Sequence, residues 1–426
     1  MMIHILCYNL TNRLAYTLNF IFKDVLQANY KVISDVGENP DQHPMICYGS
    51  EKIEGAFHIP GSEILDSDSI TSVVVEAVGT GKDCILFPAK GPDINFDIFG
   101  AVFYLISRYE EYLAYEEDLY KRFPHTSSIA FKHGFLNYPI VDKWINGLAA
   151  ALKRYFPALN FPARKFSHLP SYDIDMAWAF RYKGILRNLG GWIRRPRSER
   201  LKVLFNLSPD PFDSFTFLKD LHKKFELRPI YFWLVARERG RLDKNISPRV
   251  PAMKKLISGH SEYENGLHPS WHSHTSVNGI QEEKQLLEEI LQKPITASRQ
   301  HYLRFRLPET YEALICAGIS NEYSMGYGSI NGFRASTASS FNWFNLRANE
   351  ETTLKIHPFG FMDANSLYEQ RQTPEQSFIE LMEYVEVCRQ EGCRLITVFH
   401  NNFLGSADDF RGWKEMYERF IQEVHS

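Results

Sequence analysis

Two acids at the end of a predicted strand constrain this chain more than any other feature. The segment Ser171-Tyr172-Asp173-Ile174-Asp175 closes an apolar approach that begins near Phe166, which predicts a short buried strand. Because side chains alternate across a strand, Asp173 and Asp175 are expected on the same face. Two carboxylates on one face repel each other unless a cation or a proton separates them. The alternative of two solvated acids, with Asp175 capping a helix, stays open from this segment alone.

From Phe166 onward, strand-like and helix-like segments alternate, which favours a parallel sheet covered by helices. The predicted strands are Phe166–Tyr172, Pro229–Val235, Gly266–His268, Ile295–Tyr302, Ser320–Tyr327, Gly332–Ala335, Leu354–Met362 and Leu395–His400. The predicted helices are Phe215–Phe225, Arg249–Ser258, Gln281–Leu291, Pro308–Ala317, Thr373–Glu391 and Phe410–Val424. This order predicts an α/β fold, a distorted (β/α) barrel of about seven strands, with functional residues at the carboxyl ends of its strands.

The first part of the chain predicts a smaller α/β unit. Its expected strands and helices are Ile3–Tyr8, Asn12–Leu26, Tyr30–Ser34, Met45–Tyr48, Ala56–Ile59, Asp83–Phe87, Asp97–Leu113 and Ile140–Tyr155. Prolines between Pro157 and Pro162 indicate a linker. The expected domains are therefore residues 1–163, an accessory domain called the N-terminal unit below, and residues 164–426, the barrel. The acids between Glu110 and Asp118 are expected to form a solvated helix end.

The composition excludes several classes of function. The chain is 44% hydrophobic and 23% charged with a formal net charge of -3, so no nucleic-acid or anionic-membrane partner is expected. It shows neither a secretory signal nor a membrane span, and its six scattered cysteines fit reduced thiols, which together predict a cytoplasmic protein. The basic segment Arg181–Lys202 is expected to be a solvated loop and helix, with a flap for an anionic glycan or lipid head group as the alternative.

A cluster of histidines follows Gly266-Leu267, in the segment His268-Pro269-Ser270-Trp271-His272-Ser273-His274. His268 and His272 are spaced to share one face of a turn or helix and to bind one metal ion, with His274 as a competing partner. Joined to the two acids at another strand end, they predict an Asp/His/His site with an open position for water. That set of ligands suits zinc or another first-row divalent metal ion.

The order and the strand-end placement of these residues resemble the polysaccharide deacetylases, carbohydrate esterase family 4, over about Phe166–Leu404. Members of that family are distorted (β/α) barrels that remove N- or O-acetyl groups from sugars. The resemblance implies that Asp173 is the general base and that Asp175, His268 and His272 are the metal ligands.

Two later segments extend the resemblance. Arg299-Gln300-His301-Tyr302 fits the family's third motif, which implies that Arg299 orients the base. The apolar strand Leu395–His400 matches the last motif, which implies that His400 is the general acid. The predicted substrate contacts are Trp271 and Tyr302, as aromatic residues for the sugar face, and Arg334.

The chain also departs from the family pattern. Ile174 separates acids that are usually adjacent, and Pro269 follows the first metal histidine where the family has Ser or Thr. A fourth motif rich in Asp and Trp has no clear counterpart, and Arg334 or Asp363 stands in its place. The pattern predicts a divergent bacterial subfamily that carries an N-terminal accessory domain.

Three functions are compatible with the sequence. The first is a metal-dependent hydrolase that removes an N- or O-acetyl group from a sugar or polysaccharide precursor. The second is a non-catalytic carbohydrate-binding or assembly protein on a degenerate deacetylase barrel. The third is a metal-independent glycosidase using Asp173 and Asp363. The expected partner is an acylated carbohydrate, and the sequence predicts no particular oligomeric state.

Overall fold

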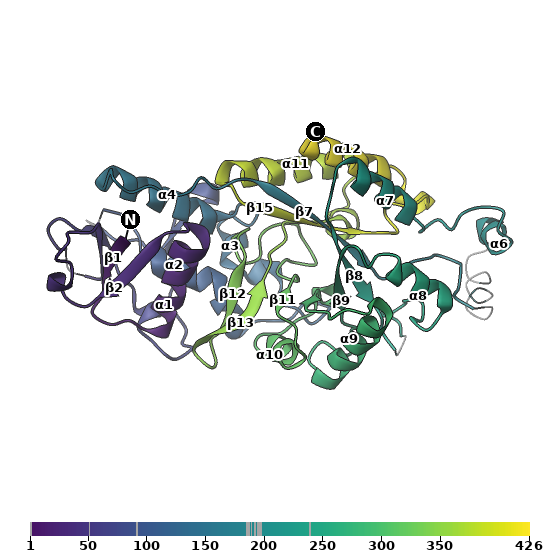
Figure 1. Ribbon diagram of the computed structural model, residues 1–426, viewed down its shortest axis with the longest axis horizontal. Helices are drawn as coiled ribbons and strands as arrows, with labels where there is room; N and C mark the ends of the chain where they lie inside the picture. Colours follow the sequence, from purple (N-terminus) through teal and green to yellow (C-terminus); the bar gives the residue numbers. More distant parts are fainter. Residues whose placement is uncertain are drawn as a thin grey trace.

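Two parallel sheets organise the computed structural model, which describes residues 2–50, 52–90, 93–184, 188, 190, 193, 198–237 and 240–426 (Figure 1). The basic segment is described only in part. Trp192, Arg187, Arg194, Arg195 and Arg197, on which the predicted flap depends, lie outside the described residues.

The smaller sheet belongs to the N-terminal unit and has the order β2-β1-β3-β4, with every pair parallel. Its strands are β1 Met2–Leu6, β2 Asn29–Ile33, β3 Met45–Tyr48 and β4 Phe57–Ile59, and a separate antiparallel pair is formed by β5 Ala77–Val78 and β6 Ile85–Leu86. Its helices are α1 Asn12–Leu18, α2 Ile98–Ile106, α3 Ile129–Lys132 and α4 Ile140–Tyr155. Every residue of α2 is buried, which is typical of a helix that is apolar on all sides.

The larger sheet has the order β12-β13-β11-β10-β9-β8-β7-β15-β14 and is parallel except for β12, which runs antiparallel to β13. Its strands are β7 Ser167–Ile174, β8 Ile230–Leu234, β9 Glu264–His268, β10 Ala297–Ser298, β11 Asn321–Glu322, β12 Phe341–Asn345, β13 Glu350–Ile356, β14 Phe361–Met362 and β15 Arg394–His400. In the described part of the chain β12 and β14 are the edges of this sheet, and no ladder joins them into a closed barrel.

Helices connect most of these strands (Figure 1). They are α6 Ser198–Leu204, α7 Phe215–Lys224, α8 Pro251–Ser258, α9 Val277–Leu291, α10 Glu309–Cys316, α11 Pro374–Glu391 and α12 Trp413–His425. The start of α11 shows why its residues form a helix where they do, because Thr373 and Gln376 make a capping box and Pro374 fills the first helical position. None of the described helices is long and apolar enough to cross a lipid bilayer.

Two predicted strands within the larger sheet were wrong. The segment Gly332–Ala335 forms turns rather than a strand, and Leu354–Met362 is interrupted between β13 and β14 around Pro358, which cannot donate to a ladder. β12 was not predicted. The register of the central strands places the predicted acids and histidines together, because Asp173 pairs with His400 across β7 and β15.

The N-terminal unit and the larger sheet share one hydrophobic core. The ring of Phe344 on β12 lies 5.0 Å from the ring of Tyr16 on α1 and 5.2 Å from the ring of Phe103 on α2. Phe341 packs against Phe20 in the same way, and all of these residues belong to a single buried cluster. The larger sheet begins at β7 and the hydrophobic core is continuous from the N-terminal unit into it, so the domain boundary at residue 163 stays a prediction.

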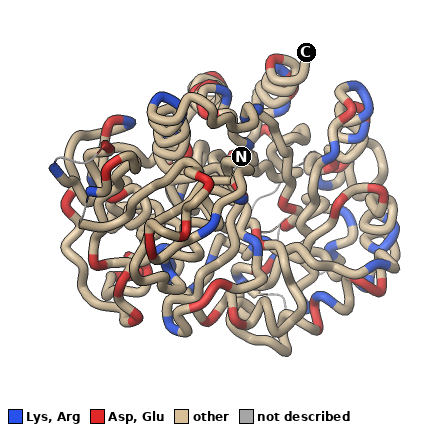
Figure 2. Tube along the Cα trace, turned by 60° about the vertical axis from the view of Figure 1, so that its left-hand side comes forward, with Lys and Arg blue, Asp and Glu red and all other residues tan. Residues whose placement is uncertain are grey.

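The charged residues are distributed over the whole trace rather than gathered on one side (Figure 2). Two acids of the predicted solvated run behave differently from the expectation. Glu110 and Glu111 are buried, because α2 ends at Ile106 and Arg108 adopts a left-handed backbone conformation that turns them inward.

Candidate active site and metal centre

Asp173 and Arg299 form a buried ion pair at the carboxyl end of β7. Nη1 of Arg299 donates a hydrogen bond of 2.8 Å to Oδ1 of Asp173, and Nε donates to the carbonyl oxygen of Tyr323. The guanidinium carbon also lies 4.3 Å from the ring centre of Phe232. These contacts fix the position of the Arg299 guanidinium, and with it the position of the positive charge that faces Asp173. The structure brings the predicted base and its predicted orienting residue together.

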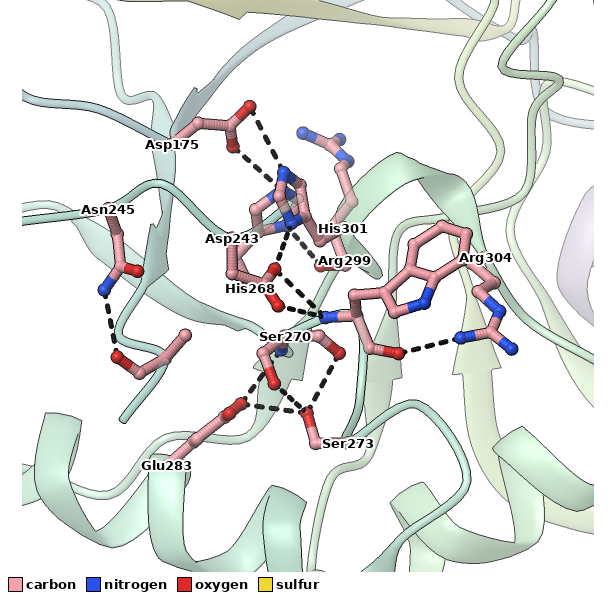
Figure 3. Close-up of polar contacts among 12 residues, drawn as sticks. Asp175, Asp243, Asn245, His268, Ser270, Ser273, Glu283, Arg299, His301 and Arg304 are labelled. Carbon is pink, nitrogen blue, oxygen red and sulfur yellow. Dashed lines mark hydrogen bonds and ion pairs between the residues drawn. The ribbon is translucent and has the colours of Figure 1, made fainter. Parts of the chain in front are cut away.

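Asp175, His268 and His301 form a second group directly beside this pair (Figure 3). Nε2 of His268 lies 3.2 Å from Oδ1 of Asp175, and Nε2 of His301 lies 3.5 Å from Oδ2 of the same carboxylate. One candidate ligand atom from each of the three residues lies within 4.8 Å of the others. The side chains come from the ends of β7 and β9 and from the turn after β10.

His272, the predicted third ligand, lies apart from this group and is exposed. The prediction assumed that His268 and His272 share one face of a turn or helix, whereas His268 ends β9 and His272 lies in the turn that follows. That turn is tied to α9, because Glu283 accepts hydrogen bonds from the backbone N–H of Ser270 and the hydroxyl of Ser273 (Figure 3). The structure places His301, which was quoted in the sequence only as a neighbour of Arg299, where His272 was expected.

Each of the two histidines is held through its other ring nitrogen. Nδ1 of His268 donates to the carbonyl oxygen of Arg299 at 2.5 Å, and Nδ1 of His301 donates to Oδ1 of Asp243 at 2.7 Å. Both rings are thereby oriented with Nε2 toward Asp175. A carbonyl or carboxylate behind an imidazole is the usual arrangement around metal-binding histidines. No sequence signal pointed to Asp243, which lies in a loop far from the other residues along the chain.

The charges in this group shift the pKa values of its members. Burial raises the pKa of Asp175, but His301, His268 and His400 outweigh it and hold that pKa well below the usual range. Burial lowers the pKa of His301, and the carboxylates of Asp175 and Asp243 reverse the effect and raise it to about 9. The two carboxylates thus favour the charged form of His301, whose Nε2 lies 3.5 Å from Oδ2 of Asp175.

The donor set fits a divalent first-row metal ion such as zinc. One carboxylate and two neutral imidazoles are a common set of three protein ligands, which leaves a fourth position for water. Oδ1 of Asp175 is buried and has no hydrogen-bond partner, although a histidine nitrogen lies 3.2 Å away. A buried carboxylate oxygen without a donor is expected where a cation supplies the missing interaction.

His400 completes the group of ionisable residues at the end of β15. Its Nδ1 donates to Oδ1 of Asp363 at 2.6 Å, its backbone N–H donates to Oδ2 of the same carboxylate, and its Nε2 lies 3.8 Å from Asp175. Burial lowers the pKa of His400, but Asp363, Asp175 and Asp173 together raise it to about 10. The three acids therefore favour the charged form of His400, whose Nε2 lies on the side of Asp175.

Asp173, Asp175, His268, His301 and His400 line one cavity of about 280 Å³. Gln300 also lines it, and both polar atoms of its side-chain amide are buried without a hydrogen-bond partner, so they are free to bind a ligand. Tyr302, a predicted substrate contact, lines the same cavity. Trp271 stands behind Tyr302, with ring centres 5.6 Å apart, and is not among the described lining residues.

Arg334, the third predicted substrate contact, does not reach the cavity in the described structure. It is buried, and its Nε and Nη2 donate to the two carboxylate oxygens of Glu111 at 2.8 and 2.6 Å. The structure thus gives Arg334 a partner in the N-terminal unit. The sequence offered no sign of this pair because the two residues are 223 positions apart.

Comparisons with known proteins match parts of the chain. A model for a family of unknown function, DUF7033, matches residues 3–157, which is less than half of the chain. No curated protein matches the sequence.

Several solved structures resemble part of the fold. A putative polysaccharide deacetylase from Mycobacterium smegmatis is 12% identical, with a TM-score of 0.42 over 63% of this chain and 87% of its own. A probable polysaccharide deacetylase from Pseudomonas aeruginosa is 12% identical, with a TM-score of 0.40 over 61% and 85%. A CE4 family pseudoenzyme from Bacillus anthracis is 10% identical, with a TM-score of 0.32 over 62% and 63%. At these scores the resemblance carries no argument about activity, which has to come from the residues of the site.

Proposed function

We propose that this protein is a metal-dependent hydrolase that removes an acetyl group from a sugar or a sugar-containing precursor. The observation that carries the proposal is that Asp173, Asp175, His268, His301 and His400 line one cavity and belong to three groups. These are the pair of Asp173 and Arg299, the cluster of Asp175, His268 and His301, and the pair of His400 and Asp363. The first provides a base, the second a set of metal ligands, and the third a proton donor.

The base in this mechanism is Asp173. A divalent metal ion held by Asp175, His268 and His301 would lower the pKa of a bound water and polarise the acyl carbonyl. Asp173 takes the proton from the attacking water, and Arg299 keeps the carboxylate aimed at the cavity through its hydrogen bond of 2.8 Å. Arg299 also balances the negative charge that two neighbouring carboxylates would otherwise leave in a buried place.

The acid is His400. Asp363 accepts a hydrogen bond from the Nδ1–H of His400. The proton on Nε2 therefore faces the cavity and is available to the departing amine or alcohol. General acid catalysis by a positioned side chain typically contributes about 10²–10⁴ in rate. Asp363 also stabilises the charged imidazole before the proton leaves, as a carboxylate behind a catalytic histidine generally does.

The choice of an acetylated sugar rests on the family resemblance of the motifs, while the choice of amide or ester hydrolysis rests on the site. A base, an acid and a Lewis-acid position around one point are the parts that hydrolysis of an acyl bond needs. Gln300 and Tyr302 provide a polar amide and an aromatic ring in the same cavity. These are the two kinds of contact that a sugar ring uses, hydrogen bonds to hydroxyls and packing against a flat face.

Metal content of the purified protein tests this proposal first. Wild-type protein and His272→Ala are expected to hold about one equivalent of a first-row metal, and His301→Ala is expected to lose it. Acetate release from a panel of N- and O-acetylated sugars is then measured with the metal-loaded protein. Asp173→Asn should keep the metal and lose about 10²–10⁴ in kcat.

Each outcome separates the candidate functions. Absence of metal after reconstitution would overturn the hydrolase mechanism. A bound metal with sugar binding and no acetate release would support the non-catalytic carbohydrate-binding protein. Cleavage of a glycosidic bond that survives removal of metal by a chelator would favour a glycosidase that uses Asp173 and Asp363.

A further inference from the structure

A loop of the N-terminal unit reaches the cavity of the candidate active site. The loop Asp118–Arg122 lies within the stretch matched by the family of unknown function, yet Tyr120 and Arg122 both line the cavity. The Arg122 side chain is only 6% exposed. Its Nε donates to Oδ2 of Asp118 at 2.8 Å, and its Nη1 donates to the carbonyl oxygen of Tyr302 at 2.9 Å.

Tyr302, whose carbonyl oxygen binds Arg122, has an unfavourable backbone conformation. Tyr302 has φ 59° and ψ 13°, and the next residue, Leu303, has φ 52°. A left-handed conformation at a residue other than glycine costs on the order of 1–3 kcal/mol and persists only where the surroundings hold it. This turn directly follows His301, so its conformation sets the direction from which the imidazole approaches Asp175.

The loop supplies contacts that hold this turn. The ring of Tyr120 stacks on the ring of Tyr302 with 5.3 Å between centres and 17° between planes, while Arg122 binds the Tyr302 carbonyl. Gly328 makes the approach of Arg122 possible, because a Cβ at that position would lie 1.8 Å from Nη1 of Arg122. The side chain and the backbone of Tyr302 are thus both bound by residues of the N-terminal unit.

The loop is itself anchored to the larger sheet at other points. Glu117 pairs with Arg306, and Nδ1 of His125 lies 2.8 Å from the hydroxyl of Ser329. These contacts fix the loop from both sides, so its position at Tyr302 does not depend on a single bond. They also provide a control, because Glu117 and Arg306 join the same two parts of the chain and are both partly exposed.

We propose that the loop Asp118–Arg122 is a positioning element for the candidate metal centre. Arg122 and Tyr120 hold the left-handed turn at Tyr302 and thereby aim Nε2 of His301 at Asp175, while Asp243 holds the other nitrogen of the same ring. The proposal rests on the metal site of the proposed function. It assigns the N-terminal unit a part in the chemistry, although none of its residues is a ligand.

Zinc affinity tests the proposal without a substrate. The affinity of the intact protein for Zn²⁺ is measured by competition with a chromophoric chelator, for wild type, Arg122→Ala, Arg122→Lys and Arg306→Ala. Loss of a group that orients a metal ligand typically weakens binding about 10–100-fold, and Arg122→Ala is expected in that range. Arg122→Lys should recover only part of the loss, because an ammonium cannot hold Asp118 and Tyr302 in the fork geometry of a guanidinium. Arg306→Ala should stay within about twofold of wild type, since a partly exposed pair contributes little.

The outcomes distinguish this inference from the proposed function. Wild-type protein that binds no zinc would overturn the metal site and this inference with it. Wild-type binding with an equal affinity in folded Arg122→Ala would overturn the inference alone, as would an equal loss in Arg306→Ala, which would indicate general loosening between the two parts. If Arg122→Ala does not fold, Tyr120→Leu tests the same turn through the ring stack, with the same expected loss and the same overturning result.

Discussion

Two sets of buried charged side chains in this molecule differ in how completely their hydrogen bonds are made. One lies between the N-terminal unit and the larger sheet and consists of Arg108, Glu110, Glu111, Tyr327 and Arg334. We call it the interunit network. The other is the group at the strand ends around Asp175. Both are buried, and both combine acids with cations.

The interunit network is fully paired. Arg108 donates to Glu111 at 2.7 Å, to Glu110 at 2.8 Å and to the hydroxyl of Tyr327 at 3.3 Å, while Arg334 binds both oxygens of Glu111. The second oxygen of Glu110 accepts the backbone N–H of Ile129. Among the described residues, no buried side-chain nitrogen or oxygen of this network lacks a partner.

The strand-end group leaves several buried atoms without partners. They are Oδ1 of Asp175, Nη2 of Arg299 and both polar atoms of the Gln300 amide. An unpaired buried polar atom costs free energy, so a folded protein keeps one mainly where a ligand, ion or water completes the bond. The comparison teaches that burial and charge alone do not identify a site, whereas unpaired atoms around a cavity do.

The largest expected effect comes from breaking the interunit network. Glu111→Ala leaves Arg108 and Arg334 buried without their shared carboxylate, and removal of one partner from a buried ion pair typically costs about 3–5 kcal/mol. The free energy of unfolding, from urea titrations followed by circular dichroism, should fall by that amount. Glu117→Ala, which removes only a partly exposed pair, serves as the control. A loss below about 1 kcal/mol in Glu111→Ala would mean that the network is not structural.

Asp175→Asn is expected to affect zinc affinity more than the free energy of unfolding. Asp175 is 30% exposed and His301 keeps Asp243 as a partner, so the free energy of unfolding should fall by only about 1–2 kcal/mol. Zinc affinity should fall by more than about 100-fold, because the carboxylate is a ligand and not only an orienting group. Equal zinc affinity, together with a stability loss like that of Glu111→Ala, would place Asp175 with the structural residues.

Glu322 offers a smaller test, since it is a buried acid that belongs to neither set. It accepts hydrogen bonds from Ser324 and Tyr311, and burial raises its pKa from 4.5 to about 7. An acid with a raised pKa binds its proton more tightly in the folded state, so stability is lost as the pH rises from the unfolded pKa through about 7. Glu322→Gln should therefore gain on the order of 1–3 kcal/mol relative to wild type between about pH 5 and pH 8. A difference between the two proteins that does not change with pH would contradict the raised pKa.

Much of the strand-end group could be predicted because it depends on order along the chain. A buried strand that ends in Asp173 and another that ends in His400 are visible as apolar runs followed by ionisable residues. Parallel strands bring their carboxyl ends to one edge, which is where Asp173 and His400 lie, and the sheet order that makes β7 and β15 neighbours brings the two residues into register. The parallel α/β character of the larger sheet was predicted for the same reason.

The partners from distant loops could not be predicted in this way. The spacing of His268 and His272 suits a helix, and only the turn bound to Glu283 shows that the chain takes another course. His301 was visible in the sequence beside Arg299, and a search for histidines near every predicted strand end would have included it. Asp243 has no such signal, because its role depends entirely on the position of a loop in space.

In the interunit network, residues that the sequence predicted in solvent or in the cavity are buried and paired with other members of the network. Glu110 and Glu111 were expected in solvent because a run of acids is usually solvated, and Arg334 was expected in the cavity because it stood in the place of the family's fourth motif. Glu110 pairs with Arg108, and Glu111 pairs with both Arg108 and Arg334, so the contact between Glu111 and Arg334 joins residues 223 positions apart. The sequence shows which residues are charged, but which of them pair with one another depends on the tertiary structure.

The continuous core between the two sheets has a consequence for synthesis of the chain. The N-terminal unit emerges from the ribosome before the larger sheet. The rings of Phe344, which packs against α1 and α2, and of Phe341, which packs against Phe20, follow roughly 180 residues later, a delay of roughly 10–40 s at usual elongation rates. During that interval the part of the N-terminal core that packs against Phe341 and Phe344 lacks its native partner. Nascent chains stalled before residue 341 should therefore bind chaperones or proteases more readily than chains stalled after β13.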